Sequence, residues 1–186
     1  AVLAARLALP VLDVRGRGIS ADSARERRVR ARGRFDYAAE RVWPGRSFEG
    51  TPGVALITPL RLGDGSAVLV DRGWAPSADA FHVDRAAYRE PDSASVAGLA
   101  LVPPRGRGDV EAADAAGLLP FVIQQEEPEA ERGLPRRWPA PALDNGPHLS
   151  YAIQWFSFAL IALVGTAALL RRTRAAPGVG VSRAPE

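Results

Sequence analysis

The chain has 186 residues, of which 47% are hydrophobic, so it can hold one domain with a packed core and one membrane segment. Its 24 positive charges are all arginines and are nearly balanced by 21 acidic residues, which argues against binding to nucleic acid. The absence of cysteine and methionine excludes disulfides, thiolate nucleophiles and thioether ligands for copper, and two histidines are too few for a His-rich zinc site.

An alternating pattern over residues 29–37 predicts the first half-buried β-strand. One of its faces carries only arginines, at Arg28, Arg30, Arg32 and Arg34. Such a face could meet anionic lipid headgroups, haem propionates or an acidic partner. Solvated charge is the commoner explanation, and it is the one we prefer from the sequence.

The next segments predict a mainly β domain. Apolar residues 54–60 and 67–74 flank a Gly-Asp-Gly-Ser turn, which is typical of a β-hairpin. Residues 95–102 and 121–125 predict two further strands, and residues 109–116 predict a helix between them. The expected fold class is therefore mainly β (α+β), either barrel-like or sandwich-like.

The end of the chain predicts a membrane helix. Residues 126–146 are rich in proline and charge and predict an extended connector over the domain surface. The following run up to residue 170 has no charge over 22 residues from Leu149, enough for a helix of roughly 33 Å, which matches a bilayer core. We therefore expect a domain over residues 1–147, a transmembrane helix over 148–170 and a disordered tail over 171–186. A buried core helix is the alternative for the apolar run.

The charges that flank this run predict its orientation. Arginines follow it at Arg171, Arg172 and Arg174, so its C-terminal end should lie in the cytoplasm and the domain outside. Residues 1–12 are too short and too charged to cross a bilayer, so we expect a first membrane helix that precedes this chain.

Three segments resemble the surfeit locus protein 1 family. They are GRFDY at residues 33–37, VLVDRGWAP at 68–76 and GPHLSYAIQWF at 146–156. Members of this family have a first membrane helix, a β-rich domain outside and a second membrane helix that opens with a His-Leu-x-Tyr-x-x-x-Trp pattern. Asp71 stands where many members carry asparagine.

The resemblance implies a function in the plasma membrane of a bacterium. The chain would be a membrane-anchored assembly factor for the haem-copper (cytochrome c) oxidase, acting as a chaperone of subunit I and binding or delivering haem a, and not an enzyme. Its implied partners are oxidase subunit I, other oxidase assembly factors and the lipid bilayer, without nucleic acid. A membrane-tethered binding module unrelated to respiration is the alternative. A hydrolase is disfavoured because no Gly-x-Ser-x-Gly motif is present.

The candidate haem site lies at the start of the membrane helix. Pro147 suits the first helical turn, where the helix dipole disfavours an imidazolium, so His148 should carry a neutral imidazole of the kind that binds haem iron. Tyr151 and Trp155 share its helical face and are the other predicted haem contacts. Helix capping by His148 and interface anchoring by the two aromatic residues are the alternative roles.

The candidate partner contacts lie in two places. Arg72, Gly73 and Trp74, at the end of the predicted hairpin, could pack within the domain or dock on oxidase subunit I, and packing is preferred. Gln154 is a polar residue in the predicted span and is expected to contact a partner helix.

Overall fold

The computed structural model describes residues 2–102, 117–131, 133, 135–140 and 148–175. They belong to two units, Ala1–Pro141 (the barrel unit) and Ala142–Glu186 (the helix unit). The strands are β1 (Leu12–Val14), β2 (Arg27–Phe35), β3 (Arg41–Phe48), β4 (Thr51–Arg61), β5 (Ala67–Pro76), β6 (Ser93–Leu101) and β7 (Leu118–Glu127). The helices are α1 (Val2–Leu7), α2 (Ala21–Ala24) and α4 (His148–Ala175), with 3₁₀ turns η1 (Tyr37–Ala39) and η2 (Arg85–Tyr88).

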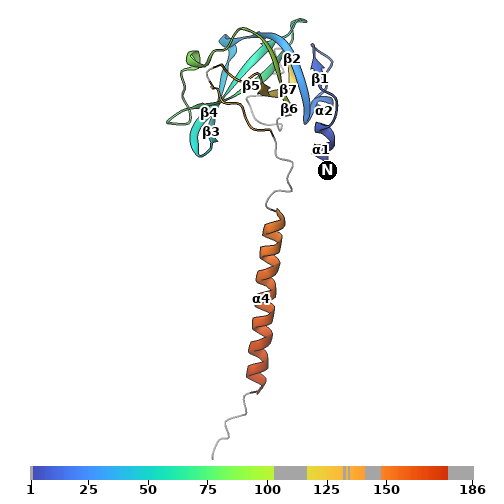
Figure 1. Ribbon diagram of the computed structural model, residues 1–186, viewed down its shortest axis with the longest axis vertical. Helices are drawn as coiled ribbons and strands as arrows, with labels where there is room; N and C mark the ends of the chain where they lie inside the picture. Colours follow the sequence, from blue (N-terminus) through green and yellow to red (C-terminus); the bar gives the residue numbers. More distant parts are fainter. Residues whose placement is uncertain (1, 103–116, 132, 134, 141–147, 176–186) are drawn as a thin grey trace, which may run out of the picture. The chain divides into compact units, whose positions relative to one another are not determined.

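The strands form one sheet that closes on itself. Its order is β1-β2-β6-β7-β5-β4-β3, and an additional pairing joins β2 to β4 through Arg34 with Arg61 and Phe35 with Leu60. Strands β2, β6, β7, β5 and β4 therefore make a closed barrel, whose curling strands are visible in Figure 1. Closure leaves the central strands with no free edge. The expected mainly β, barrel-like domain is confirmed.

Strand β2 shows how the sequence pattern builds the barrel. Val29, Ala31 and Phe35 point into the main core, while the arginines between them point outward, as the alternation predicted. The strand ends at Phe35, and Tyr37 begins η1. Strand β4 differs because its residues 53–60 are buried on both faces. A second hydrophobic cluster, which includes Trp138, covers its outer side.

The predicted hairpin lies in β4 and β5, and the two later strands lie in β6 and β7. Strand β3 was not predicted, because Pro44 and Gly45 interrupt its pattern at a bulge between Trp43 and Arg46. The expected helix over residues 109–116 lies outside the described residues.

The first half of the expected connector contributes to the barrel unit. Strand β7 runs to Glu127, and Arg136 then forms a β-bridge with Trp74. Arg137 donates to the partly buried Glu90 and Trp138 donates to the buried Asp71, so residues 135–138 are bonded into the barrel unit and do not simply cross its surface. Residues 141–147 lie outside the described part of the chain.

Helix α4 contains a segment, Tyr151–Arg171, that is long and apolar enough to cross a membrane. Its mean hydropathy is 1.9, and none of its side chains is buried within the protein. The helix continues through Arg171 to Ala175, into the part of the chain where a tail was expected.

Candidate functional site

The Arg72 side chain lies inside the barrel unit and is fully buried. Its Nε donates to Thr58 Oγ1 at 2.8 Å, and its Nη2 donates to Glu40 Oε2 at 2.5 Å. Its Nη1 donates to the Tyr88 carbonyl at 2.7 Å and to Glu90 Oε2 at 2.9 Å. A buried guanidinium is costly unless it is paired in this way, so these partners are what allow Arg72 to stand in the middle of a strand.

Aromatic rings complete the surroundings of Arg72. The Arg72 guanidinium lies 5.1 Å from the Tyr37 ring centroid and 5.8 Å from that of Phe35, within cation–π range. The Tyr37 hydroxyl donates to the Glu90 carbonyl at 2.9 Å and accepts from the Glu90 amide at the same distance. Burial raises the pKa of Tyr37, so this hydroxyl keeps its proton at neutral pH.

A second arginine, in the segment after β7, forms hydrogen bonds with Glu90 and Arg72. Arg137 is 8% exposed, and it donates to both carboxylate oxygens of Glu90 and to the Arg72 carbonyl. Its Nε also donates to the Pro128 carbonyl at 2.9 Å. We call the side chains of Arg72, Arg137, Glu40, Glu90 and Thr58 the arginine network. Two arginines and two glutamates balance its charge.

Asp71 forms a separate contact on the other side of β5. Trp138 Nε1 donates to its two carboxylate oxygens at 3.1 and 3.0 Å, and the Gly73 amide donates to Oδ1 at 3.0 Å. Burial raises the pKa of Asp71 to about 6, and these donors oppose the shift only in part. Each of these bonds uses Asp71 as an acceptor, so a carboxylate serves them without the need for an amide donor.

Gly73 is required by a close approach of two chain segments. Its φ is +120°, and a Cβ atom would lie 2.3 Å from the Arg136 carbonyl oxygen. At the next residue, the Trp74 amide donates to the Arg136 carbonyl at 2.8 Å, and the Arg136 amide donates to the Trp74 carbonyl at 2.7 Å. A side chain at Gly73 would push the segment that contains Arg136 away from β5.

The Arg-Gly-Trp segment is therefore an internal feature of the barrel unit. Arg72 is fully buried and Trp74 is 6% exposed, so neither side chain offers a surface to another protein. Docking on subunit I was the less preferred role of these residues, and it stays a prediction that their burial does not support. The other role, packing, describes the contacts of Arg72, Gly73 and Trp74.

Sequence reasoning missed the partners of Arg72 and Asp71. No role was predicted from the sequence for Glu40 or Glu90, and Arg137 and Trp138 were placed in the connector over residues 126–146. The available signal was Arg72 itself, because an arginine between apolar residues of a predicted central strand needs buried carboxylates.

The predicted haem contacts lie in the helix unit. His148 is the first residue of α4, and spacings of three and seven residues place Tyr151 and Trp155 on its helical face. The Tyr151 side chain is 56% exposed and that of Trp155 is 70% exposed. Trp155 packs edge-on against Phe158, with ring centroids 6.2 Å apart. Gln154 is also exposed.

The two units together define a class of protein: a small closed β-barrel with a buried arginine network, and one apolar helix that could span a membrane. Comparison with protein families narrows this class, since residues 1–160 match the model of the SURF1 family. The chain belongs to the SURF1 (surfeit locus protein 1) family, as the three segments predicted. The family is one of cytochrome oxidase assembly factors rather than of enzymes. No curated protein matches the chain.

Proposed function

We propose that this protein is a membrane-anchored assembly factor of the haem-copper oxidase that acts as a chaperone of subunit I and presents haem a at the start of α4. The observation that carries the proposal is the extent of the family match. It covers the barrel unit and continues to residue 160, so it includes His148, Tyr151 and Trp155 at the start of α4.

The placement of these residues suits a flat macrocycle. Tyr151 and Trp155 are separated by one helical turn, and both side chains are more than half exposed, so each leaves ring surface on which a haem could stack. Histidine is the residue that holds haem iron in many proteins, and His148 occupies the same face one turn earlier. The His148 imidazole would hold the iron of a bound haem, and the Tyr151 and Trp155 rings would lie against its macrocycle.

The charge pattern supports a defined orientation. Arg171 and the two arginines that follow it mark the cytoplasmic end of the span under the positive-inside rule. The barrel unit then lies outside the cytoplasm, on the same side as the start of α4. A proteolysis experiment on intact cells tests this arrangement, because a barrel unit that stays protected until the cells are lysed would contradict it.

Haem binding can be tested with a control that the chain itself provides. The full-length protein is produced together with haem a biosynthesis enzymes and purified in detergent, and its absorption spectrum is recorded. His148→Ala should lose the haem band, whereas His82→Ala should keep it, since His82 is the other histidine and is exposed in a loop beside Asp79. Equal haem content in wild type and His148→Ala would contradict the role of His148.

The chaperone role predicts a physical complex with subunit I. Gln154 is an exposed polar residue in the span, where a hydrogen bond to another helix is favourable. Gln154→Leu should therefore reduce the amount of subunit I that co-purifies, while Leu163→Ile should not. Recovery of other membrane proteins without any oxidase subunit would instead support a binding module unrelated to respiration.

A further inference from the structure

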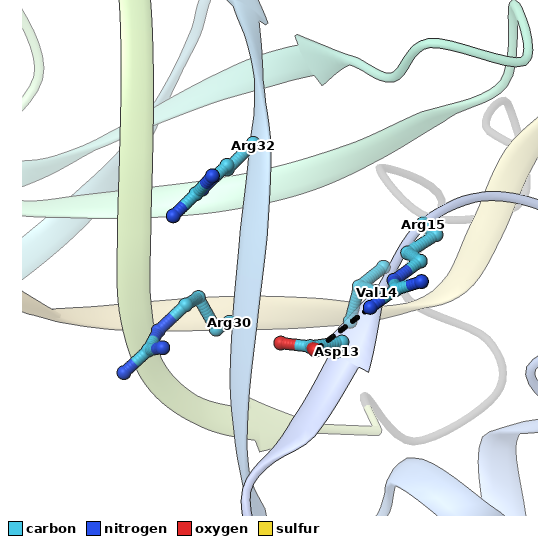
Figure 2. Close-up of a pocket in the computed structure, with 5 residues that line it drawn as sticks. All are labelled: Asp13, Val14, Arg15, Arg30 and Arg32. Atoms are coloured by element: carbon cyan, nitrogen blue, oxygen red, sulfur yellow. Dashed lines mark hydrogen bonds and ion pairs between the residues drawn. The ribbon is translucent and has the colours of Figure 1, made fainter.

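The arginine face of β2 borders a hollow of about 410 Å³ on the barrel unit. The hollow is lined by Asp13, Val14, Arg15, Arg30 and Arg32. Figure 2 shows the two β2 arginines extending on the same side of their strand, while Arg15 is joined to Asp13 by an ion pair of 3.3 Å. Three arginines against one aspartate leave the lining with an excess of positive charge.

The outer arginines of the face already have carboxylate partners. Arg28 pairs with Glu126 at 2.8 Å, and Arg34 pairs with Asp92 at 3.4 Å. Their charges are thus partly neutralised within the protein.

The two central arginines differ because of their neighbours in the sheet. In β6, Ala97 lies opposite Arg30 and Ser95 lies opposite Arg32, so β6 offers them no acid. In β1, Asp13 lies opposite Arg30 but is paired with Arg15. Among the residues that the structure describes, Arg30 and Arg32 have no ion-pair partner and are exposed. They can bind an anion without giving up another contact.

Exposed apolar side chains precede β1, the strand that pairs with β2. In the described part of the barrel unit, the large hydrophobic side chains that are exposed are Val2, Leu9, Val11 and Phe81. Leu9 and Val11 directly precede β1, which lines the hollow. Exposed apolar residues and unpaired arginines on two paired segments are a combination typical of a surface that contacts a lipid interface.

A bilayer is the anionic surface that this chain would meet most often. Only residues 142–147 separate the barrel unit from α4, and an extended chain of that length spans at most roughly 20 Å. A membrane crossed by α4 is therefore held within reach of the barrel unit at a high effective concentration.

We infer that the hollow between β1 and β2 binds the phosphate of an anionic phospholipid headgroup, with Leu9 and Val11 entering the adjoining lipid interface. The guanidinium groups of Arg30 and Arg32 present paired N–H donors that match phosphate oxygens. This contact would hold one side of the barrel on the membrane surface. It depends on membrane anchoring and is independent of the oxidase and of haem.

The test measures binding of fluorescent phosphatidylglycerol to the full-length protein in a neutral detergent. R30Q/R32Q should weaken binding about thirtyfold, as expected for the loss of two arginines at an anionic lipid. R28Q/R34Q is the matched control, because it removes the same charge from the same face but takes arginines that are already paired. It should change binding less than about threefold. R30K/R32K should retain only part of the binding, because lysine keeps the positive charge but lacks the paired N–H donors.

Several outcomes would overturn the inference. Equal losses in the two glutamine variants would mean that overall charge, and not the hollow, attracts the lipid. Equal binding of phosphatidylcholine would exclude recognition of anionic lipid. Full competition by inorganic phosphate at the same concentration would assign the hollow to free phosphate, and competition by polyglutamate alone would assign it to an acidic protein.

Leu9→Ser/Val11→Ser should weaken lipid binding, and an unchanged affinity would contradict the apolar contact.

Discussion

The barrel unit and the start of α4 use their family-specific residues in opposite ways. In the barrel unit, Arg72 and Trp74 are buried and bonded to residues of the same unit. In α4, Tyr151 and Trp155 are largely exposed, and no side chain of the candidate span is buried. Of the three segments that identify the family, those at residues 33–37 and 68–76 therefore build the fold, and the one at the start of α4 carries side chains that are available to other molecules.

This difference separates two kinds of expected mutational effect. Substitutions in the arginine network should change the stability of the barrel unit, because they leave buried charges without partners. Substitutions at the start of α4 should leave that stability unchanged and alter binding. The following predictions test the division, beginning with the largest expected effect on stability.

Arg72→Met should cause the largest loss of stability in the barrel unit. It removes the guanidinium that pairs with Glu40 and Glu90, and so leaves a buried and a partly buried carboxylate with fewer partners. The free energy of unfolding should fall by about 3–5 kcal/mol, measured by chemical unfolding and near-ultraviolet circular dichroism. Arg34→Met is the control, because the Arg34–Asp92 pair is exposed and should contribute less than about 1 kcal/mol. Equal losses would show that the network is not a stabilising core element.

Gly73→Ala should have the next largest effect. The φ of +120° and the 2.3 Å approach of a Cβ atom to the Arg136 carbonyl both oppose a side chain there. We expect a loss of about 2–4 kcal/mol in the same unfolding measurement. Gly63→Ala provides the comparison, since nothing lies within 4 Å of its Cβ position. A fully stable Gly73→Ala protein would contradict the close packing of Arg136 on β5.

Asp71→Asn should change the pH dependence of stability. The pKa of Asp71 is raised from 3.8 to about 6 by burial, so the folded protein holds this proton more tightly than the unfolded chain does. Ionisation of Asp71 therefore costs stability as the pH rises through this interval, and the cost is absent at lower pH.

The asparagine variant does not ionise and avoids that cost. Its unfolding free energy relative to wild type should increase by on the order of 2 kcal/mol between about pH 4 and pH 7. Melting temperatures of both proteins at the two pH values measure this change. A difference that stays constant with pH would mean that Asp71 titrates normally.

Trp155→Leu should have the smallest effect on the barrel unit. Among the described residues, its ring contact is with Phe158 of the same helix. The unfolding free energy of the barrel unit should change by less than about 0.5 kcal/mol. A loss as large as that of Gly73→Ala would show that Trp155 supports the barrel, and the division between the two regions would then fail.

Local patterns were sufficient to predict much of the fold. The alternation in β2, the turn between β4 and β5 and the long uncharged run in α4 each depend on residues that are close in the sequence. Strand β3 was not predicted, because Pro44 and Gly45 break the alternating pattern of its residues. The bulge between Trp43 and Arg46 nevertheless keeps β3 paired with β4. The three-residue β1 is too short to give a period.

The interior of the barrel unit could not be predicted in the same way. The arginine network joins residues 40, 58, 72, 90 and 137, and their pairing is created by the way that loops fold onto β4 and β5, which spacing in the sequence does not show. Arg137 and Trp138 illustrate the limit most clearly. They stand in a segment rich in proline and charge, yet their partners Glu90 and Asp71 lie in or near the barrel.

The most direct test of the account compares oxidase haem in living cells. The gene is deleted in a bacterium that makes haem a, and reduced-minus-oxidised spectra of the membranes are recorded after complementation. The haem a signal should be low in the deletion strain, restored by wild type and His82→Ala, and not restored by His148→Ala. A normal haem a spectrum in the deletion strain would contradict a role in oxidase assembly.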